Sequence, residues 1–541
     1  MNAEFEDGTR ARMVFSVQPG LPGGCTERDN LHNHRHRARL FSLPVPVRNK
    51  RALTRPVPPV FVKNPPMPTE KLDPSLLSDV LRAALRRGAD FADIYAEQAA
   101  YASVESDDRK INSSFVQDGG VGIRVVKNNR TYYGISASEE PADLMALARQ
   151  VADAAEAEAA RETSVILIEG STNWPSSFSV PPDMLDVQQK LAIVRSGEET
   201  AWSGEKRVRQ VSIGYRDSVR RIQLASSVTG TVLEKELGLT EFSARVFVGD
   251  GNQLFVGTAG RSIFGGPEHF QGIDSFESIT LRARRNGITQ LEADDAPRGM
   301  MPVVFAPGDN GVLFHEACGH GMEADLVERG SAFAGKQGEL VASELVTLYD
   351  DGTIPCFPGS FPFDDEGIAS QRTTLIERGV LRNYLQSLVT ARKSACEPTG
   401  NGRRQNYRHP PIPRMRNTYI GAGSMNPEDI IAQTDAGLYA EVHGSGGQVD
   451  VITGRFTTSV QVAWLIEKGK RTRPVRGATL SGTGIDVLKN IDMVGNDLVI
   501  AQMSGRCGKG QSVPVGVGMP TVRVRSLLVG GKGEVWKGAT P

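Results

Sequence analysis

The chain has 541 residues, a formal net charge of −1 and a hydrophobic fraction of 39%. This length is sufficient for two or three domains with substantial cores, and the near-neutral charge does not indicate general binding to nucleic acid or to an anionic membrane. No apolar run reaches the roughly 18 residues of a transmembrane helix. The five cysteines are scattered and odd in number, which argues for a reducing compartment, so we expect a cytoplasmic protein.

The first 66 residues differ in composition from the remainder. They hold 11 Lys and Arg against 5 Asp and Glu, a balance of 11 − 5 = +6, together with nine Pro. A basic, Pro-rich segment with little hydrophobic periodicity predicts a disordered leader over residues 1–66. His32, His34 and His36 could be imagined as a metal-binding tract, but we interpret them as part of this leader. Folded sequence is expected to begin near Met67, and the leader would reflect either an upstream translation start or a species-specific tail.

Residues 67–290 are predicted to form an N-terminal α+β domain. A helix is expected from Asp73 and Pro74, a cap followed by proline, to Gly88, and a second helix is expected from Pro141. Strands are predicted at 91–96, 120–126 and 131–136, with a polar hairpin between the first two, and antiparallel strands are predicted throughout 205–285. No chemistry-bearing cluster occurs here, so the expected role of this domain is to enclose substrate or to hold a partner.

Residues 291–541 are predicted to form a second, mainly antiparallel β domain that can wrap into a barrel-like core. With the helix-plus-sheet domain before it, the whole chain is predicted to be α+β. A short buried strand at 301–305 ends at Pro307-Gly308, and Asp309 or Asn310 can then cap a helix that turns residues 312–314 toward the core. Further strands are expected at 345–349 and 374–379, and β-branched residues recur between glycines from Gly437 onward.

The predicted helix continues into the most informative segment of the chain, His315-Glu316-Ala317-Cys318-Gly319-His320. Two imidazoles beside a carboxylate suggest a metal site, with a coincidence on a helix surface as the alternative. The histidines are five residues apart, which places them about 140° apart on an ideal helix. Both can reach one ion only if the helix ends, unwinds or bulges between them. Gly319 and Gly321 flank His320 and would permit such a departure.

A catalytic zinc site usually has three protein ligands, so a third ligand is needed. Cys507 is a candidate because nearby glycines would leave its sulfur accessible and Arg506 and Lys509 would favour a thiolate, although it could equally be a small residue in a tight turn. Cys318 is interpreted as structural, because on a helix its side chain points elsewhere than that of His315. Glu323 and Asp325 are alternative oxygen ligands or a solvated face of the next turn.

Several motifs in a fixed order make the chain similar to the TldD/PmbA family of metallopeptidases, on the catalytic TldD side. The likeness extends from about Leu72 to about Gly531. The segments that carry it are His315–Asp325, Asn401–Arg404, Pro413–Thr418, Gly446–Asp450, Arg476–Leu480, Met493–Asp497 and Cys507–Gly516. His443 departs from the family pattern and is interpreted as a loop residue or as a group that supports the ligands.

The resemblance implies one zinc ion per catalytic subunit, held by His315, His320 and Cys507, with Glu316 as the catalytic acid/base. It also implies short or unfolded peptides as substrates, an enclosed chamber, and assembly with a PmbA-type partner subunit or as a homodimer. Four arginines are candidates for binding the peptide main chain or its carboxylate, with a solvated basic loop as the alternative. They are Arg403, Arg404, Arg414 and Arg416.

Two other classes of function stay open from the sequence. One is a non-catalytic scaffold or partner subunit, which the combination of two His, a Glu and a Cys disfavours. The other is a regulator of DNA topoisomerase, a role associated with the family. The net charge of −1 and the lack of a base-reading motif disfavour direct DNA binding.

Overall fold

A computed structural model describes residues 71–155, 165–170, 174, 178, 181–182, 185–501 and 506–537. The leader predicted for residues 1–66, including Cys25 and its three histidines, lies outside these ranges. Among the described helices, none combines the length and the apolar character needed to cross a membrane.

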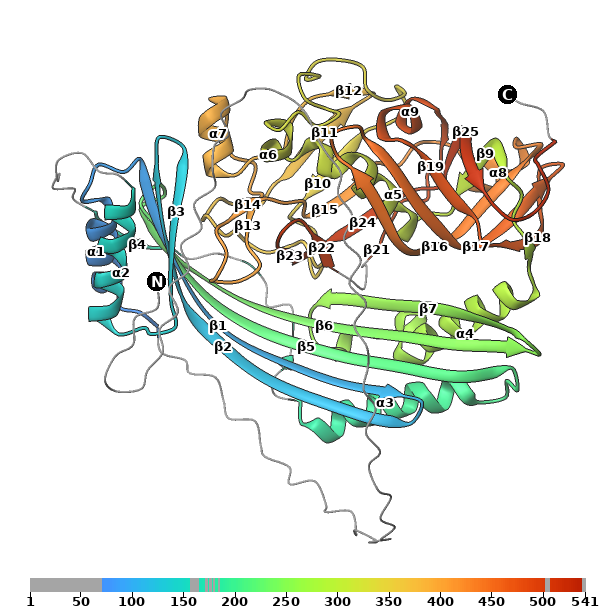
Figure 1. The fold of residues 1–541 in the computed structure, drawn as a ribbon, viewed down its shortest axis with the longest axis horizontal. Helices are drawn as coiled ribbons and strands as arrows, with labels where there is room; N and C mark the ends of the chain where they lie inside the picture. Colours follow the sequence, from blue (N-terminus) through green and yellow to red (C-terminus); the bar gives the residue numbers. More distant parts are fainter. Residues whose placement is uncertain are drawn as a thin grey trace, which may run out of the picture. The chain divides into compact units, whose positions relative to one another are not determined.

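The N-terminal part is built on one seven-stranded sheet of unusually long, curved strands (Figure 1). The order is β3-β2-β1-β5-β6-β4, and β7 pairs with β6. Both turns that join the first three strands have two residues with positive φ, Asp108-Arg109 and Asn128-Asn129, the conformation that tight hairpins require. The strands are β1 Phe91–Asp107, β2 Lys110–Lys127, β3 Arg130–Ser136, β4 Ile168–Glu169, β5 Val208–Ser226, β6 Thr231–Asp250 and β7 Gln253–Phe264.

Four helices cover this sheet in two pairs. Helices α1 (Pro74–Leu85) and α2 (Pro141–Ala154) bury one apolar side each, for example Leu81 and Leu144, against Ile123 of the sheet. Helices α3 (Val187–Trp202) and α4 (Phe276–Glu292) pack in the same way on Val211, Ile213 and Tyr215 of β5. The Asp73 cap predicted for α1 is present, since its carboxylate accepts from the Ser75 amide.

The polar hairpin expected between 96 and 120 is present as β1 and β2 joined by the two-residue turn at Asp108-Arg109, so the strands predicted at 91–96 and 120–126 are longer than expected. The side chains at 110–114 are exposed, so the apolar alternation that identifies a strand is missing there. The prediction of strands throughout 205–285 is wrong at its end, because strands stop at Phe264 and the end of the region belongs to α4, capped by Ser275.

The C-terminal part contains a closed ring of five strands. In the order β16-β9-β25-β19-β17, each strand pairs with the next, and β17 pairs back onto β16. All these pairs are antiparallel except β9 with β16. The same sheet carries β18, β8 and β20 at its sides. The strands are β8 Asp294–Asp295, β9 Gly299–Phe305, β16 Ala436–Asp450, β17 Arg455–Glu467, β18 Lys470–Arg476, β19 Thr479–Thr483, β20 Ile491–Val494 and β25 Val522–Gly530.

The C-terminal part also contains a second sheet of six strands and two small two-stranded sheets. The order in the larger sheet is β12-β11-β10-β15-β24-β21, and the hairpins are β13-β14 and β22-β23. These strands are β10 Leu348–Asp351, β11 Arg372–Glu377, β12 Val380–Leu381, β13 Gly402–Arg403, β14 Ile412–Pro413, β15 Asn417–Ile420, β21 Val499–Ala501, β22 Arg506–Gly508, β23 Ser512–Pro514 and β24 Gly516–Met519. The helices are α5 Val312–Phe314, α6 Ala324–Val327, α7 Leu388–Ser394, α8 Pro427–Ala432 and α9 Gly484–Lys489.

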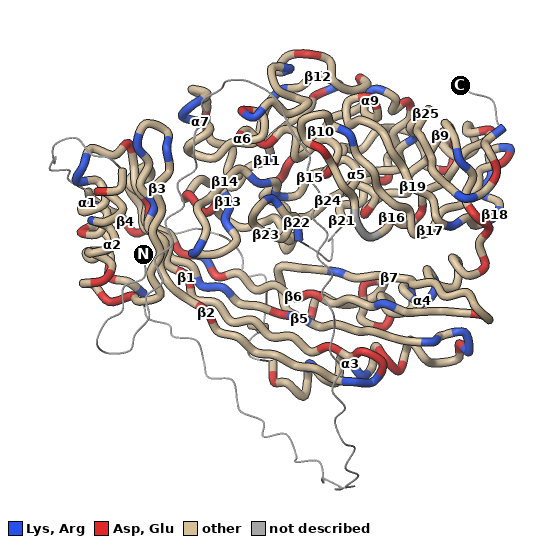
Figure 2. Tube along the Cα trace, in the orientation of Figure 1, with Lys and Arg blue, Asp and Glu red and all other residues tan. Residues whose placement is uncertain are grey.

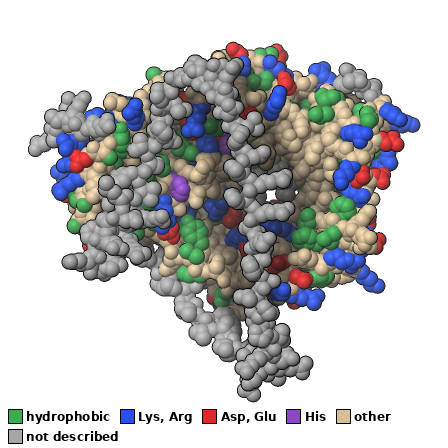
Figure 3. Space-filling view, viewed as in Figure 1, with side chains coloured by type: hydrophobic (Ala, Val, Ile, Leu, Met, Phe, Trp, Pro, Cys, Tyr) green, Lys and Arg blue, Asp and Glu red, His purple; other side chains and the backbone are tan. Residues whose placement is uncertain are grey.

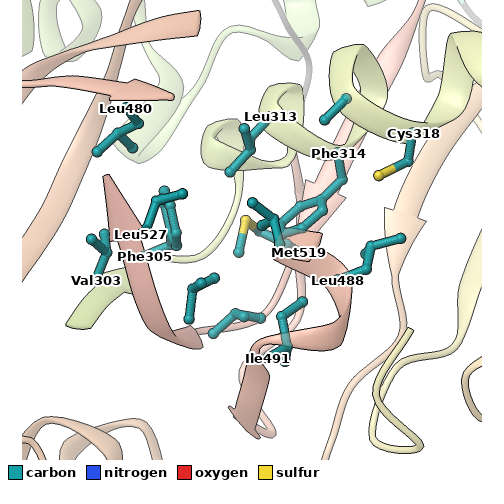
Figure 4. Packing of buried hydrophobic residues seen from close by; sticks show 14 of the residues in the cluster. Val303, Phe305, Leu313, Phe314, Cys318, Leu480, Leu488, Ile491, Met519 and Leu527 are labelled. Atoms are coloured by element: carbon teal, nitrogen blue, oxygen red, sulfur yellow. The ribbon is translucent and has the colours of Figure 1, made fainter. Parts of the chain in front are cut away.

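The main core of the C-terminal part lies under the helical segment that carries the two motif histidines. Leu313 and Phe314 point from this segment into the core that contains Phe305 and Leu527 of the ring and Met519 of β24 (Figure 4). Burial of these side chains fixes the segment on the ring. The predicted class, α+β with a helix-plus-sheet part followed by a mainly antiparallel β part, is confirmed.

A buried cluster of charged side chains joins the two parts. Arg124 of β2 forms ion pairs with Asp93 of β1, at 2.5 Å, and with Glu366 of the C-terminal part, at 2.6 Å. Arg404 contacts the same Asp93 at 3.2 Å, and these side chains are fully buried. Removal of one partner would leave an uncompensated buried charge and would destabilise this junction. On the face shown in Figure 3, exposed basic and acidic side chains are interspersed.

The core under the ring gives a test of this architecture. Leu438 of β16 is buried, so Leu438→Ala is expected to lower the free energy of unfolding by about 2–5 kcal/mol. The matched control is Leu528→Ala, because Leu528 of β25 is 46% exposed, and a change within about 0.5 kcal/mol is expected. Urea unfolding of both variants measures the difference. Equal effects would contradict the assignment of the core.

Candidate metal centre

The histidine segment begins where β9 ends. Pro307-Gly308 breaks the strand, and a 3₁₀ turn at Asp309–Gly311 leads into α5. The expected side-chain cap from Asp309 or Asn310 does not form. The Asn310 amide instead donates to the carbonyl oxygens of Ala306, at 3.0 Å, and of Ala440, at 3.1 Å, which ties the segment to β16.

The five-residue spacing of the histidines is accommodated by a π-helical turn. Residues His315–Gly319 form this turn, and the backbone N–H of His320 donates to the carbonyl oxygen of His315. A hydrogen bond between residues five apart is the defining bond of a π-helix, and it brings such residues onto one face. The bulge considered from the sequence therefore exists, and it lies between the two imidazoles.

Gly319 and Gly321 are required because a side chain at either position would clash with a neighbouring residue, not because the backbone needs the conformational freedom of glycine. Gly319 has φ −55°, an ordinary helical value. A Cβ atom there would lie 2.1 Å from Sδ of Met415, and one at Gly321 would lie 2.7 Å from the ring of Phe333. The sequence-based explanation of these two glycines, an unusual backbone conformation, is thus replaced by close packing.

Three side chains converge at this turn. Sγ of Cys507 lies 3.1 Å from Nε2 of His315 and 3.1 Å from Nε2 of His320. The three atoms lie within 4.8 Å of one another, and all three residues are buried. Cys507 is brought there by the short hairpin of β22 and β23, where it pairs with Val513. Among the described residues, this group of His and Cys side chains could hold a metal ion.

The electrostatics of the group suit metal binding. Burial would raise the pKa of Cys507, but the two imidazoles lower it to about 4. Burial would lower the pKa of His320, but the Glu323 carboxylate and the Cys507 sulfur raise it to about 10. Nδ1 of His315 is buried with no hydrogen-bond partner among the described residues. The thiolate is the form of cysteine that binds a metal, and a cation between the three atoms would take the place of the shared protons.

Glu316 lies beside the three converging atoms. Its Oε2 is 3.9 Å from Nε2 of His320, and its side chain is 27% exposed. Gly447 of β16 borders it, since a Cβ atom at that position would lie 3.6 Å from Cγ of Glu316. The Glu316 carboxylate therefore lies at the edge of the site, near the proposed ligand atoms and also in contact with solvent.

Glu323 has a role that the sequence analysis missed. It was interpreted as an alternative ligand or as part of a solvated face, but it is fully buried and its Oε2 lies 2.8 Å from Nδ1 of His320. Asp325 is partly exposed and accepts from Lys509 at 2.9 Å. The three-residue spacing of His320 and Glu323 on a helical segment is the signal that could have indicated the contact.

The remaining candidates, Cys318 and His443, are not part of the group of three converging atoms. Cys318 points into the main core, where burial raises the pKa of its thiol. His443 lies on strand β16, not in a loop, with its Nε2 3.3 Å from Oγ1 of Thr458, and burial lowers its pKa to about 4.

The four arginines that are candidates for substrate binding are buried, so they do not form a solvated basic loop. Their guanidinium groups donate to oxygens of the protein itself. Arg403 donates to Pro514 O at 2.6 Å, Arg404 to Asp365 O at 2.7 Å, Arg414 to Cys507 O at 2.7 Å and Arg416 to Gly400 O at 2.7 Å. Basic positions accordingly gather around β13, β14 and β22 (Figure 2), where they join loops to one another. Sequence cannot distinguish such arginines from exposed ones, because the carbonyl partners have no sequence signature.

The π-helical turn can be tested through a glycine that packs on it. A Cβ atom at Gly484 would lie 2.1 Å from the carbonyl oxygen of Ala317, so Gly484→Ala must displace the turn. We expect a loss of about 1–3 kcal/mol of stability and weaker metal binding, measured as metal retained against a chelator. The matched control is Gly482→Ala, whose nearest neighbour would be a Val487 methyl carbon at 3.3 Å. Equal retention by the two variants would contradict the geometry.

Comparisons with known proteins agree with this site. Residues 92–157 match the PmbA/TldA metallopeptidase domain 1, and residues 298–531 match the PmbA/TldA metallopeptidase C-terminal domain. The chain is 37% identical over 488 residues to a metalloprotease TldD homolog of Haemophilus influenzae, covering 87% of this chain and 99% of that one. It is 33% identical to a metalloprotease of Methanocaldococcus jannaschii, covering 80% and 96%.

Solved structures share the fold. A Thermotoga maritima protein described as a putative modulator of a DNA gyrase superposes with a TM-score of 0.69 at 22% identity, covering 84% of this chain and 99% of that one. TldE of Thermococcus kodakarensis gives 0.67 at 19% identity, with the same coverage. The resemblance seen in the sequence motifs and the enzyme class that it implied are confirmed: the chain belongs to the PmbA/TldD family of metallopeptidases.

Proposed function

We propose that this metallopeptidase is a zinc enzyme that cleaves short or unfolded peptides, with His315, His320 and Cys507 as ligands and Glu316 as acid/base. The observation that supports it most is the approach of three donor atoms from two distant segments to within 4.8 Å of one another. Residues 192 positions apart in the sequence meet there in a buried site, which a surface coincidence would not produce.

The donor set favours zinc. Imidazole nitrogen and thiolate sulfur are both donors that zinc binds, and three protein ligands, the number in catalytic zinc sites, leave a fourth position open. Each imidazole presents Nε2 to the site, and the Glu323 carboxylate holds the other nitrogen of His320. When bound, zinc would act as a Lewis acid that lowers the pKa of a water molecule to about 7 and polarises the scissile carbonyl.

Glu316 supplies the proton transfers in this proposal. Its carboxylate takes a proton from the attacking water and returns it to the nitrogen of the leaving amine, so the peptide gains one water and the enzyme is unchanged. Its position 3.9 Å from Nε2 of His320 supports this role, as does its partial exposure. Glu323 is unsuited to it, because it is fully buried and already paired.

The proposed substrates are peptides without stable tertiary structure. The N-terminal part, residues 67–290, carries no proposed catalytic group, and we assign it to substrate enclosure and assembly, with residues 291–541 as the catalytic part. A partner subunit of the PmbA type, or a second copy of this chain, would complete such a chamber. The fold shared with TldE of Thermococcus kodakarensis supports the first alternative.

The two other classes of function receive less support. A scaffold subunit has no use for an acid/base group beside three converging ligand atoms. The words "modulator of a DNA gyrase" belong to structures at 20–22% identity, which share only the fold with this chain. A net charge of −1 does not favour DNA binding.

Replacement of the proposed acid/base tests the mechanism. Glu316→Gln keeps the shape of the side chain but cannot accept the proton, so kcat on an unstructured peptide is expected to fall by about 10²–10⁴-fold with zinc content unchanged. The control is Glu339→Gln, because Glu339 is 60% exposed and lies in a surface ion pair with Lys336. Wild-type kcat in Glu316→Gln would exclude the proposed role.

Replacement of the proposed sulfur ligand tests the metal site. Cys507→Ser exchanges a thiolate for a hydroxyl that stays protonated at neutral pH, so zinc content after dialysis against a chelator is expected to fall well below one per chain. Cys396→Ser is the matched control, since Cys396 is free and exposed. One tightly held zinc per chain in Cys507→Ser would move the third ligand elsewhere.

A further inference from the structure

We propose that Glu323 is a positioning residue that fixes two of the three proposed ligands at once: the imidazole of His320 and the hairpin that carries Cys507. This inference rests on the proposed metal site. It adds that Glu323 holds the ligands in position before the metal binds. The two segments come from opposite ends of the C-terminal part, and one carboxylate connects them.

The first connection is to the imidazole. Oε2 of Glu323 lies 2.8 Å from Nδ1 of His320, and a carboxylate oxygen can only accept, so Nδ1 carries the proton. Nε2 is therefore the atom that faces Cys507, at 3.1 Å, and the one that can bind a metal. A carboxylate in this place fixes both the tautomer and the orientation of a metal-binding histidine.

The second connection is to the hairpin through a lysine. Nζ of Lys509, two residues beyond Cys507, lies 3.1 Å from the same Oε2 of Glu323. It also donates to Asp325 Oδ1 at 2.9 Å and to Pro413 O at 2.6 Å. The ammonium group therefore has three oxygen neighbours, all supplied by segments other than its own.

The third connection passes through a buried arginine. Nε of Arg414 lies 3.7 Å from Oε1 of Glu323, and Nη2 donates to the carbonyl oxygen of Cys507 itself at 2.7 Å. Nη1 donates to Gln511 O at 2.7 Å, at the other side of the hairpin turn. Glu323 thus forms an ion pair, without a hydrogen bond, with the arginine that donates to the backbone of the third ligand.

The backbone of Glu323 is fixed by pairing with Leu385. Hydrogen bonds from Ala324 N to Leu385 O and from Leu385 N to Met322 O, each 2.9 Å, lie on either side of Glu323. Its side chain is fully buried, so its charge depends on His320, Lys509 and Arg414 for compensation. Loss of the charge would remove one contact from Lys509 and one from Arg414 and would thereby loosen the attachment of the hairpin.

The test compares Glu323→Gln with Glu328→Gln in the full chain. Glu328 lies five residues further on, in an exposed ion pair with Lys393, and serves as the matched control. Zinc affinity is measured by competition with a chromophoric chelator, and the labelling rate of Cys507 by a thiol reagent is measured in metal-free protein, with exposed Cys396 as internal reference. We expect Glu323→Gln to bind zinc about 10–100-fold more weakly and to label faster at Cys507, and Glu328→Gln to match wild type.

A second variant separates positioning from a general loss of structure. Lys509→Met keeps the contact between Glu323 and His320 but removes one link to the hairpin, so its effect is expected in the same direction and smaller. The double variant is expected to lose less than the sum of the two single losses, because both act through one contact. Fully additive losses would overturn the shared link.

The outcomes distinguish this inference from the proposed function. Wild-type protein that binds no zinc would overturn the zinc proposal, while the labelling rates, taken without metal, would still report on the link to the hairpin. Wild-type protein that binds zinc, together with a Glu323→Gln variant of unchanged affinity and labelling, would overturn the positioning role alone. If Glu323→Gln does not fold, Lys509→Met decides, and wild-type values in that variant would overturn the role.

Discussion

One backbone hydrogen bond, from the N–H of His320 to the carbonyl oxygen of His315, determines whether the two histidines can act together. On an α-helix, residues five apart point in directions about 140° apart, and no single ion could reach both. The π-helical turn removes this difference, and both Nε2 atoms approach the same sulfur at 3.1 Å. A rare local conformation is maintained here because close packing leaves little alternative, with Met415, Phe333 and Gly484 against the turn.

The second requirement is that a distant sulfur arrives at this turn. Cys507 lies on a two-stranded hairpin too small to be stable alone, and buried polar groups hold it in place. Arg403 and Arg414 donate to carbonyl oxygens within this hairpin, and Lys509 contacts Glu323 at the histidine segment. Cations in the interior of the C-terminal part therefore contact oxygens of the same chain and hold the hairpin in place.

Sequence reasoning succeeded where a local pattern corresponds to a local structure. The cap at Asp73, the helix from Pro141 and the strand before Pro307 all appear near their predicted places. It was incomplete where a strand has exposed polar side chains on both faces. The polar residues of 110–114 are strand because β1 pairs with them, which no apolar alternation indicates.

The features of the candidate site likewise divide into those that the sequence predicted and those that it did not. The motif spacing correctly required a departure from the α-helix between His315 and His320, and the structure brings Cys507 to both. The burial of Glu323 and of the four arginines was not foreseen, because charged residues are usually exposed. Glu323 is paired with the side chains of His320 and Lys509, and the arginines donate largely to backbone carbonyl oxygens. Such interactions depend on the completed fold and have no sequence signature of their own.

X-ray absorption spectroscopy of the zinc-loaded protein tests the central claim most directly, because it reports the ligand atoms of the bound ion. The account predicts one sulfur neighbour at about 2.3 Å and two imidazole nitrogens at about 2.0 Å, with a further light atom in the open position. A spectrum without a sulfur neighbour, or one with a single imidazole, would contradict it.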